Sequence, residues 1–163
     1  SSLPKVYGGF NTSLSWKGFD LSAIFAYSIG GYIYNRDITM ILHNGSLEGR
    51  AWSTEILRRW TPDNRYTDVP ALSTTSNNWN SASTRFLQNN SYMRLKNLTL
   101  SYNLPKPWVS KLALSSVQVY VQGDNLFTIH KNQGLDPEQG ITGITYYRYP
   151  AMRTISGGIN VSF

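Results

Sequence analysis

The 163-residue sequence contains no cysteine, only two histidines and few charged residues, which make up 15% of the chain. The absence of cysteine excludes a disulfide framework, a cysteine-ligated metal site and thiol catalysis. No apolar run approaches the roughly 18 residues that a membrane-spanning helix needs, so a helical membrane span is also excluded. No charged and apolar leader opens the chain, so we expect no signal peptide in it. Serine, threonine and asparagine are abundant instead, and tyrosine leads an aromatic content of 13%.

Alternation of apolar and polar residues predicts five β-strands. In the last of them Ile155, Ile159 and Val161 fall on one side, and serine, threonine and asparagine fall on the other. Turn chemistry at Lys17-Gly18 predicts a tight hairpin between the first two strands, and Gly123-Asp124-Asn125 predicts a bulge in the fourth. The strands are expected at about residues 5–16, 19–35, 91–104, 116–130 and 152–163.

Strand length and the chemistry of the polar face favour a transmembrane β-barrel. Strands in soluble sheets average about 5 to 6 residues, whereas barrel strands that cross a membrane need about 9 to 11. The polar face is made of serine, threonine, asparagine, glutamine and glycine, which is typical of a crowded barrel interior. Aromatic residues gather near the expected strand ends, like the girdles of outer-membrane barrels; they are Trp16, Phe19, Tyr32, Tyr34, Tyr92, Tyr102, Trp108, Phe127 and Phe163.

Short and long connections between the strands alternate. The turns after Trp16 and Leu104 are short, whereas segments 36–90 and 131–151 are long and irregular. In bacterial barrels the short turns are periplasmic and the long loops extracellular. We therefore expect both long segments to be extracellular loops, with the last strand ending in the periplasmic interface.

The first long segment contains one helical signal. Trp52, Ile56 and Trp60 recur at helical spacing just before Pro62, which predicts a short amphipathic helix that caps the rim. Residues 73–90 are turn-rich and nearly uncharged, so we expect a mobile extracellular loop there.

Five strands cannot close a membrane barrel by themselves. The smallest known barrels have eight strands, and an open sheet edge in lipid leaves backbone groups unpaired at several kcal/mol each. Either several copies assemble, or these residues are the C-terminal piece of a much larger barrel.

From Asn90 onward the sequence resembles the end of the SusC/RagA family of TonB-dependent outer-membrane transporters. The similar segments are 91–105 (SYMRLKNLTLSYNLP), 120–128 (YVQGDNLFT) and 134–138 (GLDPE), followed by Tyr149-Pro150 and the final Phe163. The earlier segments 58–62 (RRWTP) and 69–70 (VP) also resemble the family's extracellular region, so the resemblance covers most of the chain.

The resemblance implies an all-β fold in which residues 1–163 form the C-terminal five strands of an antiparallel transmembrane β-barrel of about 22 strands. It implies import of oligosaccharides or peptides across the bacterial outer membrane, with a SusD-like surface lipoprotein as a lid. TonB would act through an N-terminal plug domain, which nothing in this sequence matches and which we expect to be absent from it. The implied partners also include the barrel assembly machinery, membrane lipid and, in a dimer, a second transporter–lipoprotein pair.

The sequence does not indicate metal binding, catalysis or nucleic-acid binding. His43 and His130 have no third ligand at metal-binding spacing, and Asp136-Pro137-Glu138 is interpreted as a turn element, not a calcium loop. No nucleophile elbow or phosphate loop is present, so we expect no catalytic residue, no cofactor, no metal and no enzyme activity. The formal charge of +6 is dispersed along the chain, which argues against nucleic acid and favours contact of cations near strand ends with lipid headgroups.

Two groups of residues are candidates for function. Aromatic side chains on the long loops, which can stack on sugars or apolar peptide groups, are the candidate substrate contacts; they are Trp79, Tyr146, Tyr147 and Tyr149. For each of them the alternative is rim packing or contact with the lipoprotein. By resemblance, the last strand carries the barrel assembly signal at Ile159, Val161 and Phe163, which strand addition to an exposed edge would read.

Two other functions compete with import. A soluble carbohydrate-binding β-sandwich would show similar alternation and loop aromatics. A barrel fragment that acts as a scaffold or assembly intermediate would bind another barrel through its last strand.

Overall fold

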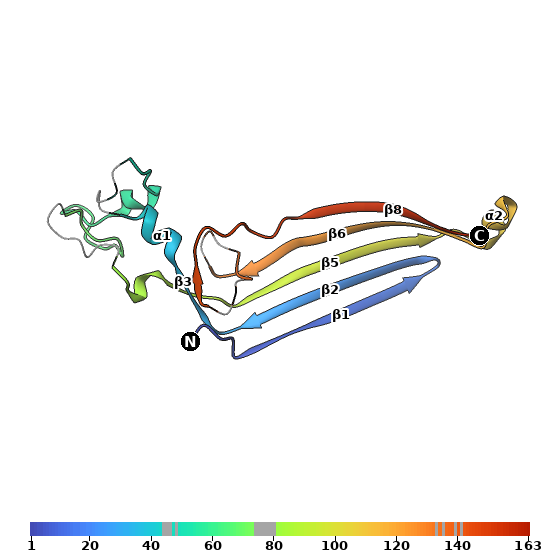
Figure 1. Ribbon diagram of the computed structural model, residues 1–163, viewed down its shortest axis with the longest axis horizontal. Helices are drawn as coiled ribbons and strands as arrows, with labels where there is room; N and C mark the ends of the chain where they lie inside the picture. The colour runs from blue at the N-terminus through green and yellow to red at the C-terminus, as the bar shows by residue number, and fades with distance from the viewer. Residues whose placement is uncertain are drawn as a thin grey trace.

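The computed structural model describes residues 1–43, 47, 49–73, 81–132, 134, 136–138, 140 and 142–163. Five long strands form one antiparallel sheet in the order β1-β2-β5-β6-β8, which Figure 1 shows as a long, gently curved layer. Irregular loops lie at one end of the sheet, and α2 lies at the other. The strands are β1 (Val6–Trp16), β2 (Phe19–Ile29), β5 (Tyr92–Asn103), β6 (Ser116–His130) and β8 (Thr154–Ser162).

The pleat gives this sheet two chemically different faces. Cross-strand partners share a face, so the register aligns apolar residues in rows such as Leu14, Leu21, Leu100 and Val121. The opposite face carries rows of polar residues such as Ser13, Ser22, Thr99, Gln122 and Ser156. The apolar face is not covered: Leu14 is 67% exposed and Ile155 is 71% exposed. Over the described residues no second sheet packs against this face, as a β-sandwich would require.

The hairpin and the bulge that the sequence predicts are both confirmed. Lys17 and Gly18 have positive φ values of 46° and 89°, as a type I′ turn requires, and β1 pairs with β2 directly across them. The register between β5 and β6 shifts between Leu95 and Asn97, opposite the segment that contains Asn125, whose φ is 52°. The bulge therefore places Leu95 and Asn97 of β5, which are two residues apart, on opposite faces of the sheet.

The connection after Leu104 is longer and more ordered than the short turn expected there. It contains the helix α2 (Lys106–Val109) and the 3₁₀ turn η3 (Ser110–Leu112). Pro105 occupies the N-cap, and a second proline stands at the first turn, where the missing N–H costs no helical hydrogen bond. Ala113 then adopts a left-handed conformation that ends the turn.

The strand expected over residues 19–35 is wrong in its length. It breaks at Gly30 and Gly31, whose φ values of 84° and 75° turn the chain out of the main sheet. The chain continues as β3, and the Gly31 carbonyl accepts a hydrogen bond from Asn90 N–H at 3.1 Å. A small second sheet results, in the order β4-β3-β7, from β3 (Tyr32–Asn35), β4 (Leu87–Asn89) and β7 (Ile144–Thr145).

The first long loop is also more ordered than expected. It contains α1 (Arg36–Ile41), the 3₁₀ turns η1 (Thr54–Arg58) and η2 (Thr84–Phe86), and β4. Asn35 caps α1 by accepting a hydrogen bond from Ile38 N–H at 3.1 Å. Residues 74–80 lie outside the described residues, so the expected mobile loop over 73–90 can be compared with the structure only at residues 73 and 81–90. In the second of these parts η2 and β4 are regular.

The short helix predicted from Trp52, Ile56 and Trp60 forms, but as a 3₁₀ helix and over fewer residues than the pattern indicated. Only the 3₁₀ turn η1 forms there, capped by Ser53 and too short to include either tryptophan. Ile56 is buried as predicted, in a small loop core with Leu42 and Val69, whereas the two tryptophans remain partly exposed. A 3₁₀ turn has three residues per turn, so side chains four apart do not share a face.

Aromatic residues gather at the end of the sheet near α2, as expected for part of the predicted girdle. Trp16, Phe19 and Tyr102 are aligned in one row, and the rings of Phe19 and Tyr102 are 4.5 Å apart. Phe127 is an exception, because it aligns through Leu95 with Phe25 inside the sheet rather than at its end.

Candidate functional site

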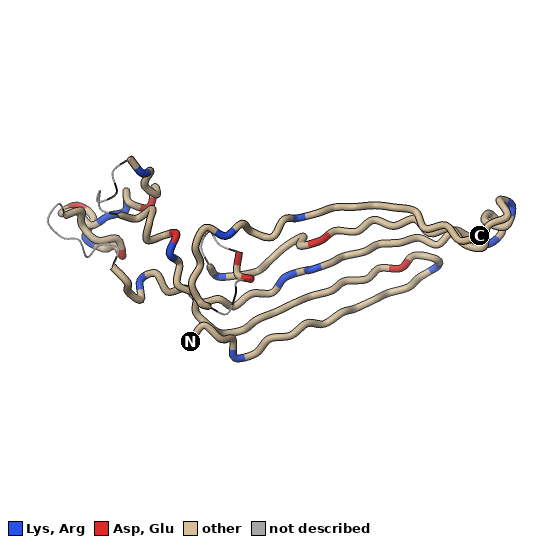
Figure 2. The backbone as a smooth tube through the Cα atoms, viewed as in Figure 1, with Lys and Arg blue, Asp and Glu red and all other residues tan. Residues whose placement is uncertain are grey.

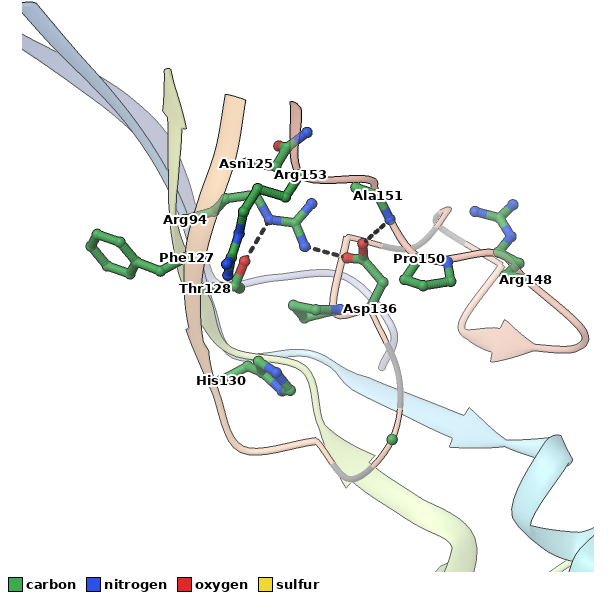
Figure 3. A pocket seen from close by; sticks show the side chains of 12 residues that line it. Arg94, Asn125, Phe127, Thr128, His130, Asp136, Arg148, Pro150, Ala151 and Arg153 are labelled. Atoms are coloured by element: carbon green, nitrogen blue, oxygen red, sulfur yellow. Dashed lines mark hydrogen bonds and ion pairs between the residues drawn. The ribbon is translucent and has the colours of Figure 1, made fainter. Parts of the chain in front are cut away.

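A charged cluster fastens the second long loop to the sheet at the loop end. Arg94 of β5 is its centre; its side chain is 4% exposed and points to the polar face. Its Nε donates to Thr128 Oγ1 at 2.8 Å, and its two terminal nitrogens donate to Glu138 Oε2 at 2.8 Å and Asp136 Oδ1 at 2.5 Å. Figure 3 shows the guanidinium between Thr128 and Asp136. We refer to Arg94, Lys96, Asp136 and Glu138 as the latch.

Asp136 joins three segments of the chain. Beyond its contact with Arg94, its Oδ2 accepts a hydrogen bond from Ala151 N–H at 2.7 Å, and its Oδ1 accepts one from Glu138 N–H at 2.9 Å. The side chain therefore holds β5 and both limbs of the loop between β6 and β8. Burial by itself would raise the pKa of Asp136, but the N–H of Ala151, the Arg94 guanidinium and the N–H of Glu138 together hold that pKa below its ordinary value.

Lys96 provides the outer part of the latch. It lies at the bulge of β5, and its Nζ donates to both carboxylate oxygens of Glu138, at 2.6 Å and 2.5 Å. Both side chains are about one-third exposed, so this pair contributes less than the buried Arg94 pair. Carboxylates of the loop therefore bind both Arg94 and Lys96 on the polar face.

An open recess of about 680 Å³ lies beside the latch. Its lining includes Arg94, Thr128, His130, Asp136, Arg148 and Arg153, and Figure 3 shows Arg148 apart from the other two arginines. In the described part of the chain, neither Arg148 nor Arg153 forms an ion pair. The recess therefore carries more positive than negative charge.

The predicted substrate-contact residues occupy different environments. The Tyr146 ring lies 4.3 Å from the Tyr147 ring and 4.8 Å from the Arg36 guanidinium. Tyr147 N–H donates to Asp37 Oδ1 at 3.0 Å, so these two tyrosines pack the second loop against α1. Tyr149 is separate from them and is 85% exposed. Trp79 lies outside the described residues.

Two residues of the predicted assembly signal, Ile159 and Val161, lie on the edge strand β8, and Phe163 directly follows the last residue of that strand. Ile159 pairs with Val119 and Val161 pairs with Val117, while the other edge of β8 has no partner strand in the described chain. Ile159 is 65% exposed and Phe163 is 94% exposed. The edge and its apolar side chains are thus accessible in this segment.

The described residues contain no group of three or more histidine, aspartate or glutamate side chains that could hold a metal ion. His43 instead accepts a hydrogen bond at Nδ1 from Trp52 Nε1 at 3.0 Å inside the loop core. Within the described ranges, no helix is long and apolar enough to cross a membrane.

Sequence reasoning did not identify the latch. Arg94 and Asp136 are 42 residues apart, and their proximity depends on how the loop folds back over the sheet. The available signal was two cations, Arg94 and Lys96, in an otherwise uncharged polar strand, and two carboxylates separated by one proline in a loop. Pairing the two cations with the two carboxylates by their opposite charge would have predicted that this loop contacts β5.

Comparison with known proteins finds relatives that share the name TonB-dependent receptor. No protein-family profile matches the chain. It is 37% identical over 98% of its length to TonB-dependent receptor P3 of Formosa agariphila, and 27% identical over 97% of its length to TonB-dependent receptor SusC of Bacteroides thetaiotaomicron. The chain spans only 16% and 15% of the lengths of these relatives.

Solved structures give the same relationship. All of the chain superposes on 18% of a chain of the RagAB peptide importer with a TM-score of 0.88 and 36% identity. The TM-score, the identity and the coverage are the same for the open-open and the closed-closed states of that importer. The relatives bear the names of receptors and importers, which agrees with the expectation that the chain is not an enzyme.

Proposed function

The chain belongs to the TonB-dependent receptors of the SusC/RagA type, as a C-terminal part of their barrel, and we propose that the protein containing it imports a nutrient across the bacterial outer membrane. The expected solute is a peptide, since a peptide importer is among the similar proteins, or an oligosaccharide, as the family resemblance implies.

The two-faced sheet is the observation that carries this proposal. Its exposed apolar face suits lipid, and its polar face suits a water-filled or plugged lumen. β1 contains 11 residues, which at about 3.3 Å per residue and a tilt of about 40° give a height of about 28 Å. That height matches the apolar band of about 25 Å on outer-membrane barrels.

Both outer edges of the sheet need partners if the sheet is in lipid. In the described chain β1 pairs only with β2, and β8 pairs only with β6. Strands from the rest of a barrel of about 22 strands would satisfy these edges. The edge of β8, with Ile159, Val161 and Phe163, would first be read by the barrel assembly machinery through strand addition.

The loop end would face the outside of the cell. A SusD-like lipoprotein would contact the loops there, and the latch would fix the position of the second loop beneath it. Among the described candidate substrate contacts Tyr149 is the most accessible, whereas Tyr146 and Tyr147 support the loop against α1. TonB would act through a plug domain encoded outside this sequence, and two transporter–lipoprotein pairs would form the dimer.

An uptake experiment tests this function. The gene for the complete protein would be deleted, and uptake of labelled oligosaccharide and peptide mixtures would be compared with that of the parent strain and of a strain without TonB. We expect one solute class to be lost equally in both mutants, and a surface lipoprotein to copurify with the complete protein in detergent. Normal uptake of both classes, together with a protein soluble in detergent-free buffer, would contradict the proposal and favour a soluble binding domain.

A further inference from the structure

The recess beside the latch lies on the polar face of the sheet. Arg94 pairs with Thr128 of β6, and His130 follows Thr128 by two residues on the same strand. Side chains two residues apart on a strand share a face, so Thr128 and His130 lie on the polar face with Arg94. The recess volume of about 680 Å³ is within the usual range of about 300–1,000 Å³ for small-molecule sites. The recess is therefore large enough for part of a solute and belongs to the side that the proposed function assigns to the lumen.

The latch balances its own charge and leaves two arginines over. Its cations, Arg94 and Lys96, bind its two carboxylates. Arg148 and Arg153 also line or border the recess, and within the described residues neither forms an ion pair. Residues 142–153 contain these two arginines and no acidic residue, so the chain that leads into β8 is purely basic (Figure 2). The recess thus has two positive charges that no described carboxylate balances.

Carboxylates on the neighbouring loop and strand are already engaged. Both oxygens of Asp136 accept hydrogen bonds from groups of the latch and the loop. Asp124, on the strand that pairs with β8, accepts hydrogen bonds from the side-chain amides of Asn97 and Gln122. The two unpaired guanidinium groups therefore remain for an acceptor from outside the described chain.

The backbone on both sides of Arg153 is fixed. Ala151 N–H donates to a carboxylate of the latch at 2.7 Å. The Met152 carbonyl accepts a hydrogen bond from Asn125 Nδ2 at 3.2 Å, and Thr154 begins β8. The guanidinium therefore projects from a backbone that is already in place, which lowers the entropic cost of binding a ligand.

Arg148 provides a second, separate cation. A Cβ on Gly140 would lie 3.4 Å from Arg148 Nη2, so this guanidinium rests close to the other limb of the loop. Figure 3 shows Arg148 apart from Arg94 and Arg153. Two spaced guanidinium groups suit a ligand that carries more than one anionic group.

We propose that the recess binds anionic groups, carboxylates or sulfates, of the imported solute, with Arg148 and Arg153 as the binding cations. This inference rests on the proposed function and deepens it by giving the solute a negative charge. Guanidinium groups form paired, charge-assisted hydrogen bonds with planar or tetrahedral oxyanions. Arg94 is not one of the binding residues, because its three nitrogens already donate to Thr128 and to the carboxylates of the latch.

Uptake of solutes sorted by charge tests the inference on cells that carry the complete transporter. Labelled peptide and oligosaccharide mixtures would each be separated by anion exchange at pH 7 into a retained, anionic fraction and an unretained fraction. Import through the transporter is the difference in initial rate between strains with and without its gene. We expect preferential import of the retained fraction of one mixture, and that mixture shows whether the anionic groups belong to a peptide or to a sugar.

A double variant tests the two arginines. Arg148→Gln/Arg153→Gln should lower the initial rate of import of the retained fraction about tenfold or more at low solute concentration, since it removes charge-assisted hydrogen bonds from two guanidinium groups. Import of unretained solutes should stay unchanged. The amounts of transporter in the outer membrane would be matched first, so that a lower rate does not reflect poor folding.

Arg50→Gln/Arg65→Gln is the matched control. It removes the same charge from the loop end, at residues that do not line the recess, and should leave import of the retained fraction unchanged. An equal loss in this control would assign the effect to the general charge of the loops and would overturn the inference.

Three other results would also overturn the inference: preferential import of an unretained fraction, equal import of both fractions, or an unchanged preference in Arg148→Gln/Arg153→Gln. The gene deletion distinguishes these failures from failure of the proposed function. Import that is lost on deletion but shows no preference for anionic solutes contradicts the inference alone. Import of every fraction that persists after deletion contradicts the proposed function itself.

Discussion

At the scale of single residues, the latch shows how one carboxylate can determine the conformation of a loop. Asp136 receives a guanidinium and two backbone N–H groups, and its side chain is only 9% exposed. Removal of a charged acceptor leaves buried donors without a partner, which is costly because the desolvation of those donors is no longer compensated.

Asp136→Asn should therefore loosen the second loop without unfolding the sheet. We expect the local opening free energy at the Ala151 and Glu138 amides to fall by about 1.5–3 kcal/mol, the range for hydrogen bonds to charged groups. Hydrogen–deuterium exchange on the complete protein measures this quantity. Asp63→Asn, which changes an exposed loop carboxylate, is the matched control and should leave these amides unchanged. Equal exchange in both variants would show that the latch does not hold the loop.

The latch should also depend on pH in one direction. Its contacts hold the pKa of Asp136 below the ordinary value of about 3.9, so its stabilising contribution is fully present above that value. The contribution is lost as the pH falls through the lower pKa of the folded state. Exchange at Ala151, corrected for its intrinsic pH dependence, should therefore show constant protection from pH 7 to pH 5 and a loss only below about pH 4. A loss of protection between pH 5 and 7 would contradict this account.

For single residues, the sequence predicted burial and turn formation better than it predicted which side chains contact each other. Ile56 is buried as its pattern indicated, and Asp136-Pro137-Glu138 forms a turn-like hydrogen bond rather than a calcium loop. The partner of Asp136 could not be predicted, because Arg94 is 42 residues away in sequence and no local pattern specifies how the loop between β6 and β8 folds back.

At the scale of elements, alternation predicted the main strands because one face of each strand is uniformly apolar. It failed at Gly30-Gly31, since the alternation continues through β3 while the backbone leaves the sheet. The small sheet joins residues from three distant segments, and β7 contains only two residues, Ile144 and Thr145, so no local pattern indicates it.

The break at Gly31 gives a prediction with an internal control. A Cβ on Gly31 would lie 2.8 Å from the Ser2 carbonyl oxygen at a φ of 75°, whereas a Cβ on Gly49, at a φ of 72°, would meet nothing within 4 Å. Both alanine variants adopt an unfavourable φ, which costs about 1–3 kcal/mol, but only Gly31→Ala adds a clash with the backbone. We expect the thermal unfolding midpoint of the complete protein to fall clearly further for Gly31→Ala. Equal midpoints would mean that the segment around Ser2 moves away at little cost.

The last strand gives a second prediction at this scale. If the apolar side chains of β8 are the assembly signal, Phe163→Ala should lower the amount of folded protein in the outer membrane several-fold. Ser162→Ala, on the opposite side of the same strand, is the control and should have little effect. Heat-modifiable mobility on gels of isolated outer membranes measures the folded amount. Equal amounts for the two variants would remove the assembly role from Phe163.

At the scale of the whole molecule, the chain can be compared with two states of one similar protein. Its backbone is equally similar to the open-open and closed-closed states of the RagAB importer, so this part of the fold does not distinguish them. The latch and the contact between Tyr147 and Asp37 fix the second loop to β5 and α1.

The central claim is that the apolar face meets lipid and the polar face meets the lumen. Because this sequence has no cysteine, single cysteines at Leu14, Leu21, Ser13 and Ser22 can carry spin labels in the complete protein, provided that the rest of it is free of cysteine. Electron paramagnetic resonance in lipid bilayers would compare collision with oxygen, which concentrates in lipid, and with a water-soluble nickel reagent. We predict oxygen-dominated relaxation at Leu14 and Leu21 and lower oxygen access at Ser13 and Ser22. Equal access of the nickel reagent to all four positions would contradict the account.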